Sequence, residues 1–211
     1  MIEKKASVTG LSVLLVALMS TGEGVGGIVE THFVRATKYH RSDPKCDPWT
    51  RRGQTSTKLR LPQDDRIVTD PNKIGNVAVD TQFVPEGSLV YETQTKMLFV
   101  STTGGTAVID RRSARAIAQM RSLPENYSRA LVFDFYFPRE VVKEHYTQCL
   151  VVEHEGRPFR TLSRASQQKR LDPEFWIEII EPLREQADKE SRQKFDVILE
   201  KLREMKGSSL G

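Results

Sequence analysis

Short apolar runs separated by polar turn residues dominate the chain from about residue 28 to residue 161. The segment 28–39 is rich in Val, Thr and Phe and is predicted to form the first strand or pair of strands. Further apolar runs, with Gly and Pro turns between them, lie at 76–79, 88–93, 96–101 and 107–109. Runs this short and this closely spaced favour a small β-barrel or sandwich over a helical fold.

Another strand is predicted over 131–137. Alternation along it places Leu131, Phe133, Phe135 and Phe137 on one face and Val132, Asp134 and Tyr136 on the other. Asp134 would then share a face with Tyr136, whose hydroxyl could hydrogen-bond to it. The segment 111–121 has the spacing of a short helix packed on the barrel, and 150–161 favours an added hairpin that turns at 155–158.

The last part of the chain, 172–207, has helical periodicity and is predicted to be a helical extension. Asp172-Pro173 is typical of a helix start, and Pro182 should kink or break that helix. A second helix is expected over 183–205, with Gly207 as its end. Its apolar stripe consists of Phe195, Ile198, Leu199, Leu202 and Met205. Such a stripe either packs on the chain's own barrel or serves partner binding or self-association.

The composition is that of a soluble globular protein. The chain has 211 residues, of which 38% are hydrophobic and 28% charged, and this length suggests one domain with appendages. A net charge of +4 does not indicate a nucleic-acid-binding protein. The segment 40–70 is polar, and its Lys and Arg residues outnumber its Asp residues. It is expected to be a solvated loop or, alternatively, a basic lip on a substrate cleft.

Residues 1–22 have the pattern of an export signal. Lys4 and Lys5 precede an apolar run over 6–19, and small residues follow. This run is too short to span a bilayer comfortably, so no transmembrane span is expected in the mature chain. The alternative is a buried amino-terminal helix or strand.

The two cysteines, Cys46 and Cys149, would close a loop of about 100 residues if they formed a disulfide. Two separate thiols are the alternative, and the sequence does not decide between them. Neither the cysteines nor the four histidines have the spacing of a metal site. No metal or other cofactor is therefore expected.

Two acids lie inside apolar, β-prone segments and are candidates for chemistry. Asp80 follows Ala78 and Val79, and Asp134 is flanked by Phe133 and Phe135. Burial disfavours an ionised carboxylate and raises its pKa, which suits a general acid. The alternative for each is a structural acid: an ionised carboxylate that accepts backbone N–H groups in the case of Asp134, and a turn-stabilising residue in the case of Asp80.

These two acids belong to a set of five short segments in a fixed order over 34–138. The segments are Ala36-Thr37-Lys38-Tyr39, Ala78-Val79-Asp80-Thr81, Val84-Pro85-Glu86-Gly87-Ser88, Thr102-Thr103-Gly104-Gly105-Thr106 and Phe133-Asp134-Phe135-Tyr136-Phe137. Together they resemble the three-aspartate (3D) domain, a relative of the catalytic region of the membrane-bound lytic transglycosylase A family. The sequence departs from the family pattern at two positions: Thr102 stands where the family has its middle aspartate, and Thr81 replaces a proline.

The resemblance implies a mainly β fold with C-terminal helices, in which 28–161 form a six-stranded double-psi β-barrel. It also implies cleavage of the MurNAc–GlcNAc bond of peptidoglycan, with a 1,6-anhydromuramyl product. Asp134 would be the acid and base, and Asp80 a supporting catalytic group. The expected substrate contacts are Thr102, Thr103, Gly104, Gly105 and Tyr136.

The sequence is also compatible with two other kinds of function. The first is a non-catalytic wall-binding or assembly protein, which the missing middle acid and the amphipathic tail favour. The second is an intracellular interaction domain, which requires that residues 1–22 are not an export signal. On the enzymatic interpretation the protein is a bacterial cell-wall protein that is periplasmic, outer-membrane-associated or extracellular, with peptidoglycan strands as its partner.

Overall fold

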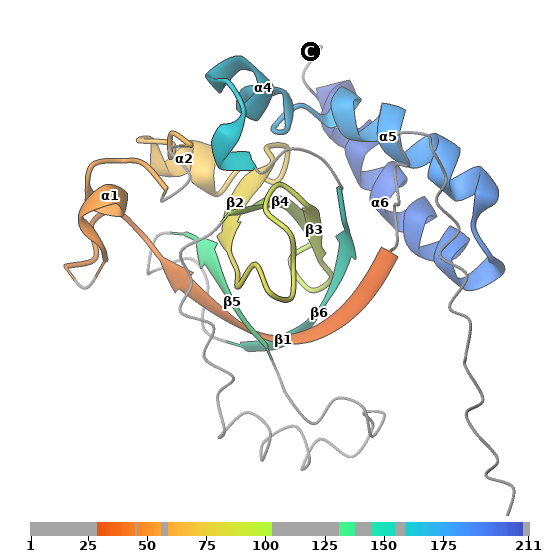
Figure 1. Ribbon diagram of the computed structural model, residues 1–211, viewed down its shortest axis with the longest axis horizontal. Coiled ribbons are helices and arrows are strands. Elements are labelled where there is room, and N and C mark those ends of the chain that lie inside the picture. The colour runs from red at the N-terminus through yellow and green to blue at the C-terminus, as the bar shows by residue number, and fades with distance from the viewer. Residues whose placement is uncertain are drawn as a thin grey trace, which may run out of the picture.

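The computed structural model describes residues 29–44, 46–55, 59–102, 131–137, 145–154 and 159–208. Six strands close into a barrel in the order β1–β5–β2–β4–β3–β6 (Figure 1). They are β1 (Val29–Tyr39), β2 (Gly75–Ala78), β3 (Leu89–Glu92), β4 (Met97–Thr102), β5 (Leu131–Tyr136) and β6 (His145–Val152). The pairs β1–β5 and β2–β4 are parallel, and the other neighbouring pairs are antiparallel. The prediction of a mainly β barrel with C-terminal helices is confirmed.

On β3, β4 and β6 the two faces of each strand belong to two separate hydrophobic clusters. On β4, Met97 and Phe99 belong to the inner cluster, whereas Leu98 and Val100 belong to an outer cluster that includes the C-terminal helices. This alternation is the period of two that a strand imposes on its side chains. The rings of Phe99 and Phe135 meet edge to face at 4.6 Å inside the barrel. Gly75 is required beside them, because a Cβ there would lie 2.7 Å from the Phe99 ring.

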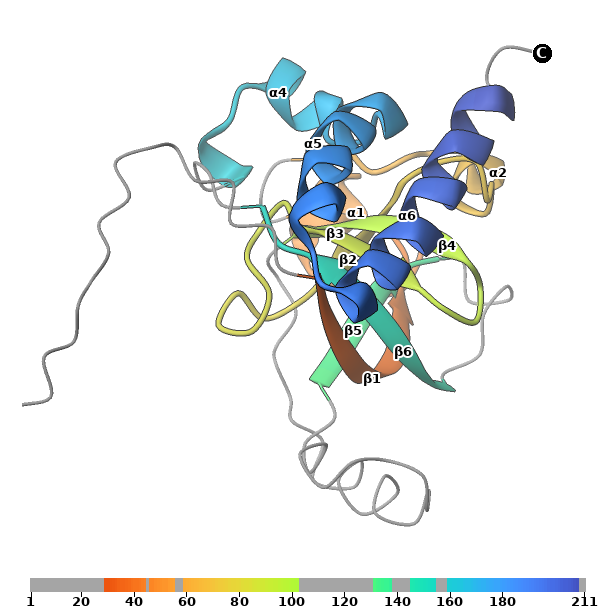
Figure 2. The same cartoon turned by 90° about the vertical axis from the view of Figure 1, so that its right-hand side faces the viewer.

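A helical hairpin covers one side of the barrel (Figures 1 and 2). It consists of α5 (Pro173–Gln186) and α6 (Lys189–Ser208). Trp176 and Leu202 are fully buried in the same cluster as Val100 of the barrel. The apolar stripe of the tail therefore packs on the chain's own barrel, which was one of the two alternatives drawn from the sequence.

The start of the hairpin is as predicted, but its internal boundary is not. The carboxylate of Asp172 caps α5 by accepting the Glu174 N–H at 3.0 Å. The helix then continues through Pro182, so the expected break there is wrong; Pro182 is exposed and removes only one helical hydrogen bond. The second helix begins at Lys189 rather than near residue 183, because Asp188 accepts the Ser191 N–H at 2.7 Å. It ends at Ser208, one residue beyond the predicted stop at Gly207.

A buried arginine joins the hairpin to the barrel. Arg170 Nη1 donates to the Gly87 carbonyl oxygen at 2.9 Å, and the guanidinium lies over the rings of Phe175 and Trp176. The Trp176 indole N–H donates in turn to the Arg170 carbonyl oxygen at 2.8 Å. Burial lowers the pKa of Arg170 to about 10, so the group remains a cation at neutral pH. The 84–88 turn and the start of α5 are thereby held together.

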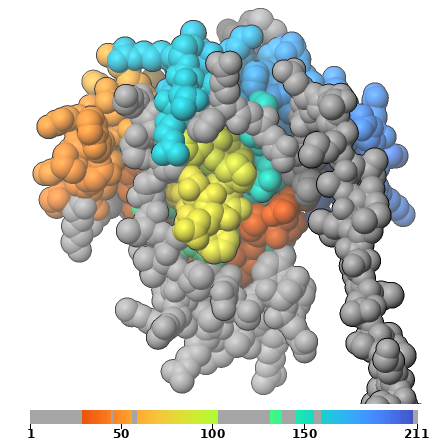
Figure 3. Space-filling model, viewed as in Figure 1, coloured from red at the N-terminus to blue at the C-terminus, as the bar shows by residue number. Residues whose placement is uncertain are grey.

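The segment 40–70 is more ordered than a solvated loop. It contains α1 (Pro48–Arg51), α2 (Asp65–Val68) and a bridge between Gln54 and Arg60. Leu61 and Val68 are buried in the inner cluster. The polar composition of this segment concealed a few apolar anchors that fix it to the barrel. α1 and the helical hairpin lie on opposite sides of the barrel, as the ribbon and the space-filling view both show (Figures 1 and 3).

The region after residue 150 also differs from the prediction. The strand β6 begins at His145, and Phe159–Thr161 form a short 3-10 helix, η2, where a second hairpin strand was expected. The helix α4 (Arg164–Lys169), which follows, was not predicted. The predicted helix at 111–121, the turn at 155–158 and the export signal at 1–22 lie outside the described residues.

Candidate functional site

The strand register places four residues of the resemblance in one row across the barrel wall. Thr102 of β4 pairs with Ala78 of β2, which pairs with Asp134 of β5, which pairs with Thr37 of β1. Directly paired residues point to the same side of a sheet. Leu98 and Val100, which share the face of Thr102, belong to the outer cluster. The row therefore lies on the outer face of the barrel.

Asp134 is half-buried in this row. The Thr37 hydroxyl donates a hydrogen bond of 2.7 Å to Asp134 Oδ1. A hydroxyl at this distance fixes the orientation of the carboxylate and stabilises its ionised form. The sequence pointed to Asp134 but not to Thr37 as its hydrogen-bond donor, although Thr37 lies in the first of the five segments.

A second polar group lies beside Asp134 and consists of Tyr39, Asn76 and Thr102. The Tyr39 hydroxyl donates to Asn76 Oδ1. Asn76 Nδ2 lies 3.2 Å from Thr102 Oγ1 and 3.3 Å from the Val100 carbonyl oxygen. Thr102, at the position of the family's middle acid, is fully buried, and its hydroxyl is bound to Asn76. Its candidate role as a substrate contact stays a prediction.

Tyr39 is held as a neutral phenol in this arrangement. Burial, followed by the nearby negative charge of Asp134, raises its pKa well above the usual value. Burial likewise raises the pKa of the half-buried Cys46 thiol, with Asp134 among the charges that add to this shift. Both groups are therefore protonated at neutral pH rather than ionised nucleophiles or bases, and the Tyr39 hydroxyl is a hydrogen-bond donor. Cys46 and Cys149 are free thiols, so the disulfide alternative does not hold in this structure.

Asp80 lies two residues beyond Ala78 and stabilises the turn that follows it. Its Oδ1 accepts the Gln82 N–H at 2.9 Å, and its carbonyl oxygen accepts those of Phe83 and Val84. These contacts agree with the structural alternative for this acid. Its supporting catalytic role stays a prediction.

Tyr136 is 2% exposed. Its hydroxyl lies 3.4 Å from the Pro62 carbonyl oxygen, and its ring meets Tyr39 edge to face and stacks on His40. Burial raises its pKa to about 12. The alternation along β5 suggested that the Tyr136 hydroxyl donates to Asp134. Among the described contacts, the hydroxyl that donates to Asp134 is that of Thr37. Thr103, Gly104 and Gly105 lie outside the described residues, and their proposed roles are untested.

Comparisons with protein-family models, curated proteins and solved structures give no match to this chain. Within the described residues, no group of three or more His, Cys, Asp or Glu side chains could hold a metal ion. No described helix has both the length and the apolar character needed to cross a bilayer.

Proposed function

We propose that this protein is an exported, peptidoglycan-active lytic transglycosylase-like enzyme that uses Asp134 as its single acid and base. The observation that carries the proposal is the half-buried Asp134 on the outer barrel face, oriented by the Thr37 hydroxyl at 2.7 Å. A glycan can approach an outer face, whereas it could not enter the packed interior of a six-stranded barrel.

The proposed barrel topology is double-psi. Its support is the closed order of six strands together with the two parallel pairs β1–β5 and β2–β4. Both parallel pairs contribute residues to the row, since the first joins Thr37 to Asp134 and the second joins Ala78 to Thr102. The topology thus brings one residue from each of four of the five segments into one row, from distant parts of the chain.

The proposed reaction starts from the protonated form of Asp134, which donates its proton to the glycosidic oxygen between N-acetylmuramic acid and N-acetylglucosamine. The resulting carboxylate then takes the proton of the muramyl 6-hydroxyl, whose oxygen attacks the anomeric carbon. One carboxylate serves both steps, because no water is needed as nucleophile. The Thr37 hydroxyl stabilises the ionised form between the two steps. Asp80, Tyr136 and the 102–105 segment are the further candidate contacts.

The proposed location follows from the expected export signal: the periplasm, the outer membrane or the extracellular space. The proposed partner is the glycan strand of peptidoglycan, and no nucleic acid or cofactor is proposed. Self-association through the helices is not part of the proposal, since the apolar stripe packs on the chain's own barrel.

One observation favours a second candidate, a non-catalytic wall-binding protein. Thr102 replaces the middle acid of the resembling family, and its buried hydroxyl is bound to Asn76. With one fewer carboxylate, the same outer face would bind a glycan without cleaving it.

Purified sacculi incubated with the mature protein would test both candidates, with soluble products measured by mass spectrometry. The wild type should release 1,6-anhydromuropeptides, and Asp134→Asn should release at least about 100-fold less because it removes the acid and base. Asp172→Asn is the matched control, since Asn caps a helix as well as Asp and this position lies at the start of α5. Retention of the wild type on sacculi without release would support the wall-binding candidate and reject the enzyme. Equal release by Asp134→Asn would remove Asp134 from the mechanism.

A further inference from the structure

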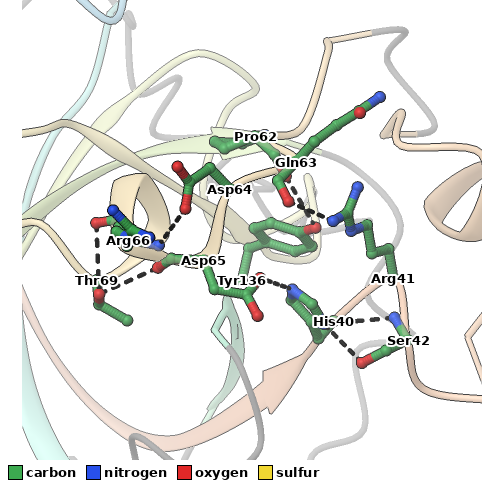
Figure 4. Close-up of polar contacts among 10 residues, drawn as sticks. All are labelled: His40, Arg41, Ser42, Pro62, Gln63, Asp64, Asp65, Arg66, Thr69 and Tyr136. Atoms are coloured by element: carbon green, nitrogen blue, oxygen red, sulfur yellow. Dashed lines mark hydrogen bonds and ion pairs between the residues drawn. The ribbon is translucent and has the colours of Figure 1, made fainter.

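Three side chains beside the β1 end of the row form an arrangement that the sequence did not predict (Figure 4). They are His40, which follows β1 directly, Ser42 in the next turn, and Asp65 at the start of α2. His40 Nδ1 lies 2.7 Å from Ser42 Oγ, and His40 Nε2 lies 3.0 Å from Asp65 Oδ1. One imidazole therefore connects a hydroxyl to a carboxylate.

The hydrogen bonds define which ring nitrogen carries the proton. The Ser42 backbone N–H donates to His40 Nδ1 at 3.3 Å. A backbone N–H can only donate, so Nδ1 is the unprotonated nitrogen and the proton is on Nε2. The Ser42 hydroxyl must then also donate to Nδ1, which is the contact that a general base makes with its nucleophile.

The ring is fixed and the serine is accessible. His40 is 4% exposed and stacks on Tyr136, with 5.2 Å between the ring centroids. Ser42 is exposed. His40 Nε2 lies within ion-pair distance of Asp65, but the angle between them is not that of a hydrogen bond. The Asp65 side chain is 57% exposed, which gives its carboxylate room to turn toward Nε2–H.

We propose that Ser42, His40 and Asp65 form a nucleophilic site for carboxylic esters. Ser42 is the nucleophile, His40 the general base and Asp65 a positioning residue. The roles match those of a Ser-His-Asp triad, with the two ring nitrogens exchanged.

The reaction balances with the ester and water alone. Ser42 Oγ bonds to the carbonyl carbon while its proton moves to His40 Nδ1. The tetrahedral intermediate collapses, the bond to the alcohol oxygen breaks, and the departing alcohol takes the proton from Nδ1. Water then attacks the acyl-serine with the same proton transfers, which releases the carboxylic acid and restores Ser42. This activity does not depend on the proposed glycan cleavage by Asp134.

A fluorophosphonate probe tests the nucleophile directly, because its phosphorus bonds to an activated serine oxygen with loss of fluoride. Labelled protein is digested and the modified residue is located by mass spectrometry. Label is expected on Ser42 at a rate at least about 100-fold above that of Ser163, and Ser42→Ala should abolish it. Ser163 is a matched internal control, because it is also exposed but contacts Ser166 Oγ instead of a histidine.

Asp65→Asn tests the positioning role without disturbing a buried group. It should slow Ser42 labelling about 10-fold, and Asp65→Glu, which keeps a carboxylate, should recover most of that rate. A purely structural Asp65 would leave the labelling rate of both folded variants unchanged.

His40→Gln should also abolish labelling, and circular dichroism would verify that this variant is folded. The proposal is overturned if the folded wild type shows no label on Ser42, or if Ser42 and Ser163 react at the same rate. An unchanged labelling rate in Asp65→Asn would remove Asp65 from the site.

Discussion

The outer face of the barrel has two regions of opposite character on the same strands. On β4, Val100 lies in the apolar cluster under the helical hairpin, whereas Thr102, two residues further along the same face, lies in the polar row with Asp134. On β1 the same change occurs between Val29 and Thr37. One region is sealed by helices and the other leaves an acid half-buried. The comparison teaches that one barrel wall can be covered by helices at one end and leave a carboxylate partly exposed at the other.

The largest expected effect of a substitution lies in the sealed region. Trp176→Ala would leave a cavity under the hairpin and an unsatisfied Arg170 carbonyl group. The free energy of unfolding, measured by urea denaturation, should fall by about 3 to 5 kcal/mol. Val197→Ala is the control, since Val197 is an exposed residue of α6, and it should change stability by less than about 0.5 kcal/mol. A cost below about 1 kcal/mol for Trp176→Ala would mean that the hairpin contributes little to the fold.

The next largest effect is expected at Glu92, a buried acid that stabilises the fold, in contrast to Asp134, the proposed catalytic acid. Glu92 is 2% exposed; burial acts to raise its pKa, but hydrogen bonds from the Thr147 hydroxyl and from the N–H groups of Gln94 and Thr95 outweigh burial and lower it. The folded pKa is below the unfolded one, so the stabilisation is present above the unfolded pKa and is lost as the pH falls through the folded pKa. Glu92→Gln should cost about 1 to 3 kcal/mol at neutral pH.

The pH dependence provides the control for Glu92. The difference in unfolding free energy between the wild type and Glu92→Gln should shrink as the pH is lowered below about 4, the region in which an unfolded Glu protonates. A difference that stayed constant down to pH 2 would show that Glu92 acts through its shape rather than through its charge.

In the polar region a substitution should affect activity more than stability. Thr37→Val removes the hydroxyl that orients Asp134, and release of anhydromuropeptides should fall about 10- to 100-fold. Thr93→Val is a matched control, because its hydroxyl bonds to the Gln148 carbonyl oxygen in the turn after β3. A Thr37→Val protein that is as active as the wild type but less stable by more than about 2 kcal/mol would place Thr37 with the structural residues.

The smallest effect is expected at the edge of the sealed region. Asp172→Ala removes the cap of α5 and should lower the free energy of unfolding by about 1 kcal/mol. Asp172→Asn keeps the capping oxygen and should restore most of that loss. If both variants were equally destabilised, the negative charge near the helix start would matter more than the cap.

Much of the fold could be predicted from the sequence because the strands carry local signals. The segments around Val77, Val90, Phe99 and Phe135 are short, apolar and bounded by turn residues, and each is a strand in the structure. Asp172 and Pro173 likewise determine the helix start by local chemistry. The predicted break at Pro182 was wrong. An exposed proline raises the free energy of a helix by too little to end it when the buried face of that helix holds it in place.

The site was less predictable, because its geometry depends on register between distant strands. The contact between Thr37 and Asp134 joins residues 97 positions apart in the chain. The contact between His40 and Asp65 requires the anchoring of 40–70 by Leu61 and Val68, and the polar composition of that segment concealed those anchors. Sequence patterns identified which acid to examine, but not which hydroxyl would orient it.

The packing of α6 on the barrel has a consequence for the time at which the protein can fold. Val29 of the first strand and Leu202 of the last helix belong to one cluster. A ribosome must therefore have synthesised the chain as far as α6 before β1 acquires its final neighbours. Until then the uncovered barrel wall would be a natural substrate for a chaperone, and a fragment that stopped before α5 would keep that surface permanently.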